Sequence, residues 1–293
     1  MKFSLWPHAS KPPAEILEEA RAVDAAGWYG VWVADHYMPN TADGIPSAGD
    51  QHEAWSLLPA LAAVTERVRI GPLVSPTSVH HPALLANRAV TIDHLSGGRM
   101  VLGLGAGWQV NEHAAYGIEL EAPGQRVTRF EEAIRIIRSL LEEERTTFAG
   151  KVYEVTDAPC DPKPVQQRLP ILVGTASPRM LRLTARYADE WNTWGVPEVA
   201  AQKRAGLLEA CERVGRDPAT IHSSVNALVD IGGEPQPGPP RLTGSAQQIV
   251  DLMGHYAAAG FDEFVVPNGI LGETLPERLD NVARIKAEII DQL

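Results

Sequence analysis

The chain has 293 residues, of which 44% are hydrophobic and 22% charged, which is typical of a globular protein with a sizeable core and unlike a disordered one. Its 37 acidic and 26 basic residues give a formal net charge of −11, which argues against nucleic acid or an anionic membrane as partner. Residues 1–13 contain neither a long apolar core nor a small-residue cleavage site, and no apolar run of about 18 residues occurs. We therefore expect a cytoplasmic protein.

Strands and helices alternate along the whole chain. The predicted strands are 2–6, 31–34, 68–74, 100–104, 171–174, 190–194, 222–230 and 264–267. The predicted helices are one from Pro13 to Gly27, then 53–65, 82–95, one around 130–141, 179–188, 199–214, 245–259 and 276–290. This order predicts a single α/β domain over residues 1–293, a (β/α)8 TIM barrel, with a doubly wound open sheet as the alternative.

Three segments interrupt the alternation. A loop of roughly 18 residues begins at Asp35, and loops of that length are usually functional. Residues 147–155, centred on Ala149-Gly150, predict a small β-hairpin insertion. Residues 232–240 hold four prolines and three glycines and predict an irregular loop.

Histidines and cysteines give no sign of a metal site. Cys160 and Cys211 lie far apart without a CxxC or Cys/His spacing, so we expect two buried thiols and neither a disulfide nor a zinc site. His80 and His81 lack a third ligand at suitable spacing. We expect no metal.

Residues 100–112 are the most informative stretch, because an apolar strand runs into three glycines and a polar-aromatic cluster. Glycine at 103, 105 and 107 removes Cβ atoms at alternate positions, which suits positive φ or a flat ligand against the main chain. The spacing is GxGxG and therefore differs from the dinucleotide-binding fingerprint.

In a barrel, the active site lies at the carboxyl ends of the strands. The residues that follow the strands are therefore the candidates, namely Asp35, His36 and Tyr37, then 75–81, 105–112, Thr175, Ala176 and Ser177, and 191–194. We expect them to face one another around one mouth.

Several candidates have two interpretations. His36 is either a hydrogen-bond donor or proton relay in a site, or a structural partner of Asp35. Glu112 is either a general acid or, as the more ordinary reading, an acid in the first turn of a helix. Ser177 could cap a helix whose amino end also holds a phosphate. Tryptophans 108, 191 and 194 are either core residues or, as we favour, pocket residues.

These residues resemble the bacterial luciferase-like oxidoreductases, in particular the actinobacterial branch that uses the deazaflavin F420. The resemblance extends over nearly the whole chain and rests on residues 30–36, 68–75, 89–99, 102–108 and 185–192. It implies a luciferase-like TIM barrel, a small-molecule substrate, and hydride transfer or oxygen activation on a flavin-type ring without a metal.

The resemblance also implies roles for single residues. Asp35 and His36 would lie beside the ring, with His36 catalytic, and Leu73-Val74 would form a non-prolyl cis peptide behind the ring. The remaining contacts to the cofactor would come from Gly105, Ala106, Gly107, Trp108 and Asn111 near the ring, and from Thr175, Ala176 and Ser177 at a phosphate.

The chain departs from the family pattern at several positions. The sugar-phosphate dehydrogenases of the family have a glutamate in place of Trp108 and a tryptophan in place of Asn40, so we expect a different substrate. The deazaflavin members tend to have a lysine just beyond the sixth strand, whereas residues 191–199 contain no basic residue. That absence leaves room for FMN. Glu190 replaces a usual glycine without a reason visible in the sequence.

Three hypotheses follow. The first is an F420-dependent oxidoreductase that moves a hydride between the deazaflavin and a small organic substrate. The second is an FMN-dependent monooxygenase supplied by a separate flavin reductase, and the third is a non-catalytic flavin-binding barrel. Helix 82–95 is apolar over most of its circumference, which favours a homodimer, as the resemblance also implies. The alternative is a core helix shielded by residues 113–128.

Overall fold

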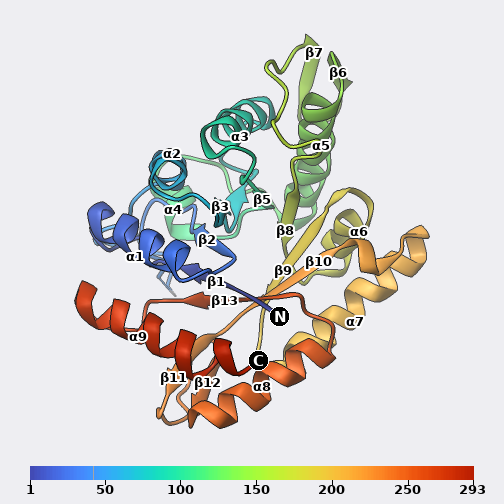
Figure 1. The fold of residues 1–293 in the computed structure, drawn as a ribbon. Coiled ribbons are helices and arrows are strands. Elements are labelled where there is room, and N and C mark those ends of the chain that lie inside the picture. Colours follow the sequence, from blue (N-terminus) through green and yellow to red (C-terminus); the bar gives the residue numbers. More distant parts are fainter. Residues whose placement is uncertain (42) are drawn as a thin grey trace.

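Strands from the whole length of the chain pair in parallel around one barrel in the computed structural model, which describes residues 1–41 and 43–293 (Figure 1). The sheet has the order β3-β2-β1-β13-β10-β9-β8-β5-β4. Its strands are β1 (Lys2–Trp6), β2 (Gly30–Val33), β3 (Arg69–Pro72), β4 (Ser75–Pro76), β5 (Leu102–Gly105), β8 (Ile171–Gly174), β9 (Glu190–Trp194), β10 (His222–Asn226) and β13 (Glu263–Pro267). The predicted (β/α)8 barrel is confirmed.

The third barrel strand is divided in two, whereas the sequence predicted one strand over 68–74. β3 and β4 stand at the two ends of the sheet order, and the backbone between them turns through a cis peptide bond at Leu73-Val74. The bridge between Ile70 and Met100 closes the barrel beside them. The expected cis peptide is therefore present, and it ends one half-strand and begins the next.

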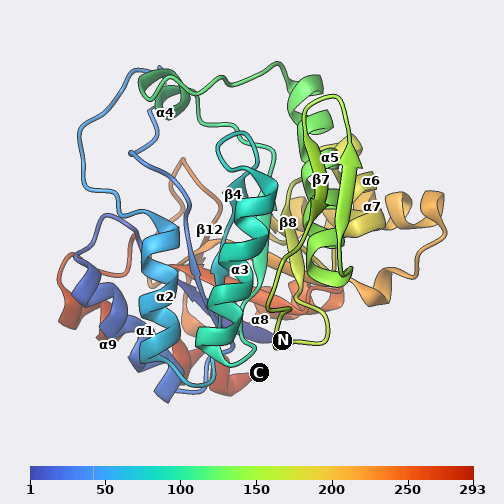
Figure 2. The same ribbon diagram turned by 90° about the horizontal axis from the view of Figure 1, so that it is seen from above.

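Helices follow the strands and cover the outside of the barrel, and Figure 2 shows the barrel from the side with α4 at the upper end. They are α1 (Pro13–Ala25), α2 (Ala54–Val64), α3 (Pro82–Ser96), α4 (Val110–Ala115), α5 (Pro123–Glu142), α6 (Pro178–Tyr187), α7 (Pro197–Val214), α8 (Ala246–Ala258) and α9 (Leu275–Glu288), with short 3₁₀ turns at Pro218–Thr220 and Ile290–Gln292. No helix in the described ranges is long and apolar enough to cross a membrane.

Two insertions decorate the barrel. The predicted hairpin is confirmed as β6 (Thr146–Ala149) and β7 (Glu154–Ala158), and it lies beside α5. The predicted strand 222–230 is wrong at its end, because the chain leaves the barrel after Asn226. Its last part, β11 (Leu228–Ile231), pairs in parallel with the unpredicted β12 (Arg241–Gly244).

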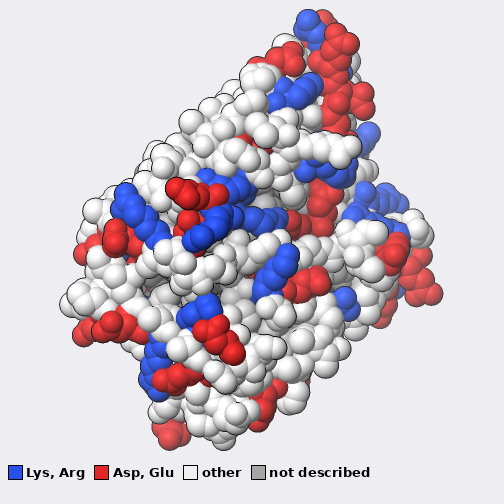
Figure 3. Space-filling model, in the orientation of Figure 1, with Lys and Arg blue, Asp and Glu red and all other residues white. Residues whose placement is uncertain are grey.

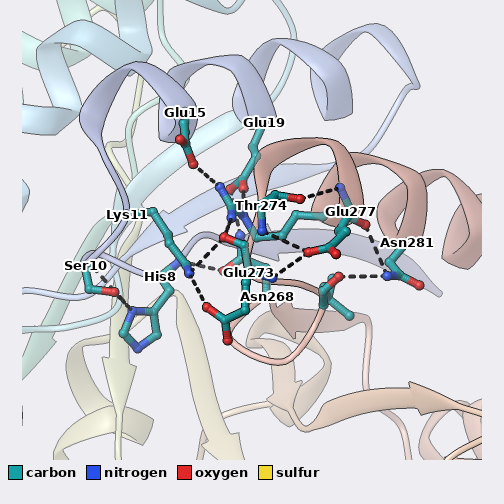
Figure 4. A network of polar contacts seen from close by, with 12 residues as sticks. His8, Ser10, Lys11, Glu15, Glu19, Asn268, Glu273, Thr274, Glu277 and Asn281 are labelled. Atoms are coloured by element: carbon teal, nitrogen blue, oxygen red, sulfur yellow. Dashed lines mark hydrogen bonds and ion pairs between the residues drawn. The ribbon is translucent and has the colours of Figure 1, made fainter.

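A buried ion pair joins the first helix to the last (Figure 4). The Arg278 guanidinium of α9 is fully buried and contacts Glu19 and Glu15 of α1. Asn268, which follows β13, donates to Glu19 Oε2 at 2.7 Å and accepts from the backbone N–H of His8 at 2.7 Å. Side chains from both ends of the sequence therefore hold the barrel closed.

Contacts at the floor of the barrel, where its strands begin, account for Glu190 in place of the family's usual glycine. This side chain, at the start of β9, forms an ion pair with Arg69 and lies beside His222 and Glu263. His222 Nε2 is 3.0 Å from Glu263 Oε2, and Trp32 Nε1 donates to the other oxygen of Glu263 at 2.9 Å. Burial raises the pKa of Glu190 in spite of Arg69. Because Arg69 pairs with Glu190 while His222 and Trp32 occupy the two oxygens of Glu263, we interpret this cluster as structural support.

Most of the apolar surface of α3 is buried against other elements of the chain. Ala86, Ala89, Val90 and Ile92 are buried on α3, which packs against α2 and α5. Leu84 remains 57% exposed. Acidic and basic side chains are interspersed over the face seen in Figure 3. The two cysteines are buried and unpaired, as expected.

Candidate active site

A cavity of about 830 Å³ opens at the carboxyl ends of the barrel strands. The sequence-predicted residues that line it are His36, Leu73, Val74, Gly105, Ala106, Gly107, Trp108, Thr175, Ala176 and Ser177. Asp35 and Asn111 do not line it. The strand ends therefore located the mouth, but Asp35 and Asn111, which were expected to contact the cofactor, lie behind its wall.

One wall consists of Val74 and the glycines around it. A Cβ atom at Gly105 would lie 2.8 Å from Val74 Cγ2, and one at Gly174 would lie 3.1 Å from both Val74 methyl carbons. Positive φ occurs at Gly107, where φ is 86°, and not at Gly103 or Gly105. The glycines thus make room for Val74 itself, and together they give the cavity a flat wall.

On the next part of the wall, His36 is paired with Glu112. The imidazole Nδ1 lies 2.9 Å from Glu112 Oε1, and the second oxygen of Glu112 accepts the backbone N–H of Tyr37 at 2.9 Å. Because a carboxylate only accepts, Nδ1 carries the hydrogen, which leaves Nε2 as the acceptor in the neutral ring. Glu112 is 2% exposed and lies in the first turn of α4, as its more ordinary reading expects, and from there it orients His36.

Asp35 supports the site from behind. It is fully buried and accepts hydrogen bonds from Ser75 Oγ, from Trp55 Nε1 at 3.0 Å and from His80 Nε2 at 2.9 Å. This network fixes the start of β4 relative to the end of β2. Asp35 is therefore not the hydrogen-bond partner of His36.

Asn111 is also buried and binds the chain itself. Its side-chain amide donates to the Pro39 carbonyl at 2.9 Å. Gln109 likewise donates to the Met38 carbonyl at 2.9 Å. Both residues tie the long loop after β2 to α4, which positions Glu112 over His36.

Another part of the cavity lining is suited to an anion. Ser177 begins α6 but its hydroxyl forms no capping hydrogen bond, contrary to expectation, so the amino end of the helix stays available. Arg126 of α5 reaches the cavity and donates to the Gly107 carbonyl, while its buried Nε has no acceptor among the described residues. Positive charge and free N–H groups therefore meet here.

A lysine also reaches this part of the lining. Residues 191–199 contain no basic residue, but Lys203, beyond that range, lines the cavity from the second turn of α7 and donates to the Trp194 carbonyl at 2.7 Å. Lys203 lies on a helix and not at a strand end, so the sequence did not mark it as a candidate.

Aromatic residues frame the entrance. Trp108 is 56% exposed and meets His36 edge to face, with ring centroids 5.5 Å apart. Trp194 lies against Trp6, a cavity residue that the sequence did not single out. Trp191 is fully buried and donates to the Thr175 carbonyl at 2.8 Å, so its assignment to the pocket was wrong.

Other lining residues come from elements that were not predicted to reach the site. Asn226 ends β10 and exchanges hydrogen bonds with Asn192 of β9 at 2.8 and 3.1 Å. Pro239 and Pro240 come from the loop before β12. Asn226 stands at the end of a barrel strand, where site residues are expected. The predicted strand 222–230 ran past it, so Asn226 was not a candidate.

The comparison with family models agrees with this geometry. The model described as luciferase-like monooxygenase matches residues 1–236, which is most of the chain and includes nearly every residue of the cavity. The chain belongs to the luciferase-like monooxygenase family.

Relatives within the family include F420-dependent glucose-6-phosphate dehydrogenases. The protein of that name from Microbacterium testaceum is 37% identical over 223 residues, which are 75% of this chain and 63% of the relative. The one from Amycolatopsis mediterranei is 34% identical over 180 residues, covering 60% of this chain and 52% of the relative. The chain thus spans between half and two thirds of the length of these curated relatives.

Solved structures confirm the luciferase-like barrel. An F420-dependent secondary alcohol dehydrogenase in complex with an F420-acetone adduct has a TM-score of 0.84 at 19% identity, with 99% of each chain covered. A coenzyme F420-dependent tetrahydromethanopterin reductase from Methanopyrus kandleri has a TM-score of 0.83 at 16% identity, again covering 99% of both chains. A monooxygenase from Streptomyces bottropensis has a TM-score of 0.81 at 20% identity, covering 100% of this chain and 99% of its own.

Proposed function

We propose that this protein is an oxidoreductase that binds F420 and moves a hydride between it and a small organic substrate such as an alcohol or a carbonyl compound. The observation that carries this proposal is the arrangement of one cavity. Its lining combines an oriented imidazole, His36 with Glu112, and residues suited to an anion, which are Ser177, Arg126 and Lys203.

The residues present fit this cofactor. Val74 and its neighbouring glycines offer a flat surface of the kind that a ring requires, and Arg126 brings a guanidinium to the lining of the same cavity. The amino end of α6, at Thr175 to Ser177, would hold the phosphate, and Lys203 would add charge. F420, when bound, supplies a two-electron hydride acceptor or donor.

The chain's own residues handle the proton. His36 Nε2 can take the hydroxyl proton that alcohol oxidation releases, or return it when a carbonyl is reduced. Glu112 keeps Nδ1 protonated and stabilises the imidazolium that forms. The entrance formed by Trp6, Trp108 and Trp194 limits water around the reacting atoms.

The substrate differs from that of the named relatives, we infer, because the edge of the cavity beside His36 offers Trp108 where the sugar-phosphate dehydrogenases are expected to have an acid. Glucose 6-phosphate should therefore not be oxidised. A panel of secondary alcohols and ketones, assayed with F420 in both directions, is the first search for the substrate.

Titration of the purified protein with F420 and with FMN tests the proposal. F420 should bind at least about tenfold more tightly, a difference of about 1.4 kcal/mol. Equal or reversed affinities contradict it, and consumption of oxygen with reduced FMN from a reductase would then support the monooxygenase. Tight F420 binding without turnover on any alcohol or ketone would support the non-catalytic barrel.

A further inference from the structure

A second hollow of about 370 Å³ continues from the active-site cavity along the outside of the barrel. It lies between α6 and α7, which pack side by side (Figure 1), and we call it the α6–α7 groove. Ala176 and Lys203 line both the cavity and the groove. The groove therefore begins at the corner where the phosphate of the cofactor is expected.

The groove is positively charged on a strongly acidic protein. Its lining contains Arg182, Lys203 and Arg213 but one carboxylate, Glu209, while the whole chain carries a formal charge of −11. Arg182 is exposed and makes no hydrogen bond or ion pair with the residues that the structure describes. Arg213 is 3.4 Å from Glu209, and both side chains are more than half exposed, so a stronger anionic partner could replace Glu209.

The helices shape the groove as a track. Lys203, Gly206, Ala210 and Arg213 lie at helical spacing on one side of α7. At Gly206 an added Cβ would come within 3.2 Å of Leu181 on α6, so glycine keeps the helices close. Lys203 and Arg213 are ten residues apart, which places them about 15 Å apart along the helix. The track thus leads from the mouth toward the floor of the barrel.

We propose that the α6–α7 groove binds the oligoglutamate tail of F420. This inference rests on the proposed function. The tail is attached beyond the phosphate and carries a carboxylate on every glutamate, so a chain that starts at Ser177 meets Lys203, then Arg182 and Arg213. FMN ends at its phosphate and has nothing to place there. The groove would therefore favour the deazaflavin over FMN as well as holding it.

The test compares F420 carrying several glutamates with F420 stripped of all glutamates. The parent should bind the tailed form about fivefold or more tightly than the stripped form, and this ratio should fall as salt is raised. The variant with Arg182→Gln and Arg213→Gln should bind the tailed form no more than about twofold more tightly than the stripped form, because only Lys203 remains to meet the tail. The control is Arg186→Gln, which removes an exposed charge from α6 outside the groove and should behave as the parent.

The possible failures are distinguishable. If the parent binds both forms with equal affinity, the groove does not hold the tail although the proposed function stands. The same conclusion follows if the double variant keeps the parent's preference for the tailed form. If neither form binds to the parent, the proposed function and this inference fall together.

Discussion

The side chain of Val74 occupies the space into which a side chain at Gly105 would project, since a Cβ at Gly105 would lie 2.8 Å from Val74 Cγ2. Gly174, on the neighbouring strand, approaches the same valine from another direction. Three backbone segments thus meet around one small aliphatic side chain, and the flat wall of the cavity depends on that contact.

Gly105→Val should therefore displace Val74 into the cavity. We expect F420 affinity to fall at least about tenfold while the barrel remains folded, because the crowding is confined to the cavity wall. Binding titration and a thermal melt measure the two effects. The control is Gly254→Val in α8, where an added Cβ meets no atom within 4 Å. A Gly105→Val protein that binds as the parent does would place the cofactor elsewhere.

His36→Ala should reduce turnover by about 10²–10⁴ while changing F420 affinity by no more than about threefold. The reason is that Nε2 handles a proton of the substrate, whereas the wall and the residues suited to an anion hold the cofactor. Steady-state kinetics and titration separate these effects. Unchanged turnover would make His36 a structural residue only.

Glu112→Gln keeps the size of the side chain but removes the charge that fixes the imidazole. We expect kcat to fall about tenfold or more, with a changed dependence of kcat on pH and an unchanged melting temperature within about 2 °C. Glu112→Asp should restore part of the rate. If Glu112→Gln alters stability but leaves the pH profile as in the parent, the carboxylate serves only to hold the backbone N–H of Tyr37.

Arg278→Met should destabilise the barrel by roughly 3–5 kcal/mol, because it leaves the Glu19 carboxylate buried without its cation. Urea denaturation measures the change in the free energy of unfolding. Arg284→Met is the control, since its partner Glu288 and Arg284 itself are both over 40% exposed and such pairs contribute about 1 kcal/mol or less. Similar effects of the two substitutions would show that the buried pair of Arg278 and Glu19 contributes no more to stability than a surface pair.

The homodimer stays a prediction, and fewer exposed apolar residues of α3 support it than the sequence suggested. Leu84 and Leu95 of α3 are 57% and 56% exposed, whereas the rest of that helix's apolar surface is mostly covered within the chain. Light scattering should give about twice 31.8 kDa. Leu84→Glu should then give a single-chain mass, and Leu208→Glu, at an exposed leucine of α7, should not. A monomer at all concentrations contradicts the dimer.

The periodicity of the sequence predicted the barrel because each βα unit is marked locally by apolar runs, prolines and caps. The capping box at Ser245 and Gln248, for example, begins α8 as its spacing indicates. Strand ends likewise located the cavity, because the fold brings all of them to one mouth. The prediction that Asp35 faces the cavity together with His36 was wrong. The side chains of these two neighbours point to different sides of the backbone, and only His36 lines the cavity.

Arg126 and Lys203 could not be found from strand ends because they extend from helices. A long, flexible side chain can reach several ångströms from its own backbone, and its direction depends on the tertiary packing of the helix. β12 was not predicted for a similar reason. Residues 241–244 have no strong strand pattern, and their pairing with β11 depends on a partner that the sequence assigned to the barrel.

The pairing of β11 with β12 gives the proline-rich loop between them fixed ends. Leu228 N–H donates to the Pro240 carbonyl at 2.8 Å, and Gly232 N–H donates to the Gly244 carbonyl at 2.7 Å. Residues between these bonds can change in length and composition without disturbing a barrel strand, yet Pro239 and Pro240 line the cavity. We therefore expect replacement of this loop to alter which substrates the proposed enzyme accepts while the strands of the barrel stay as they are.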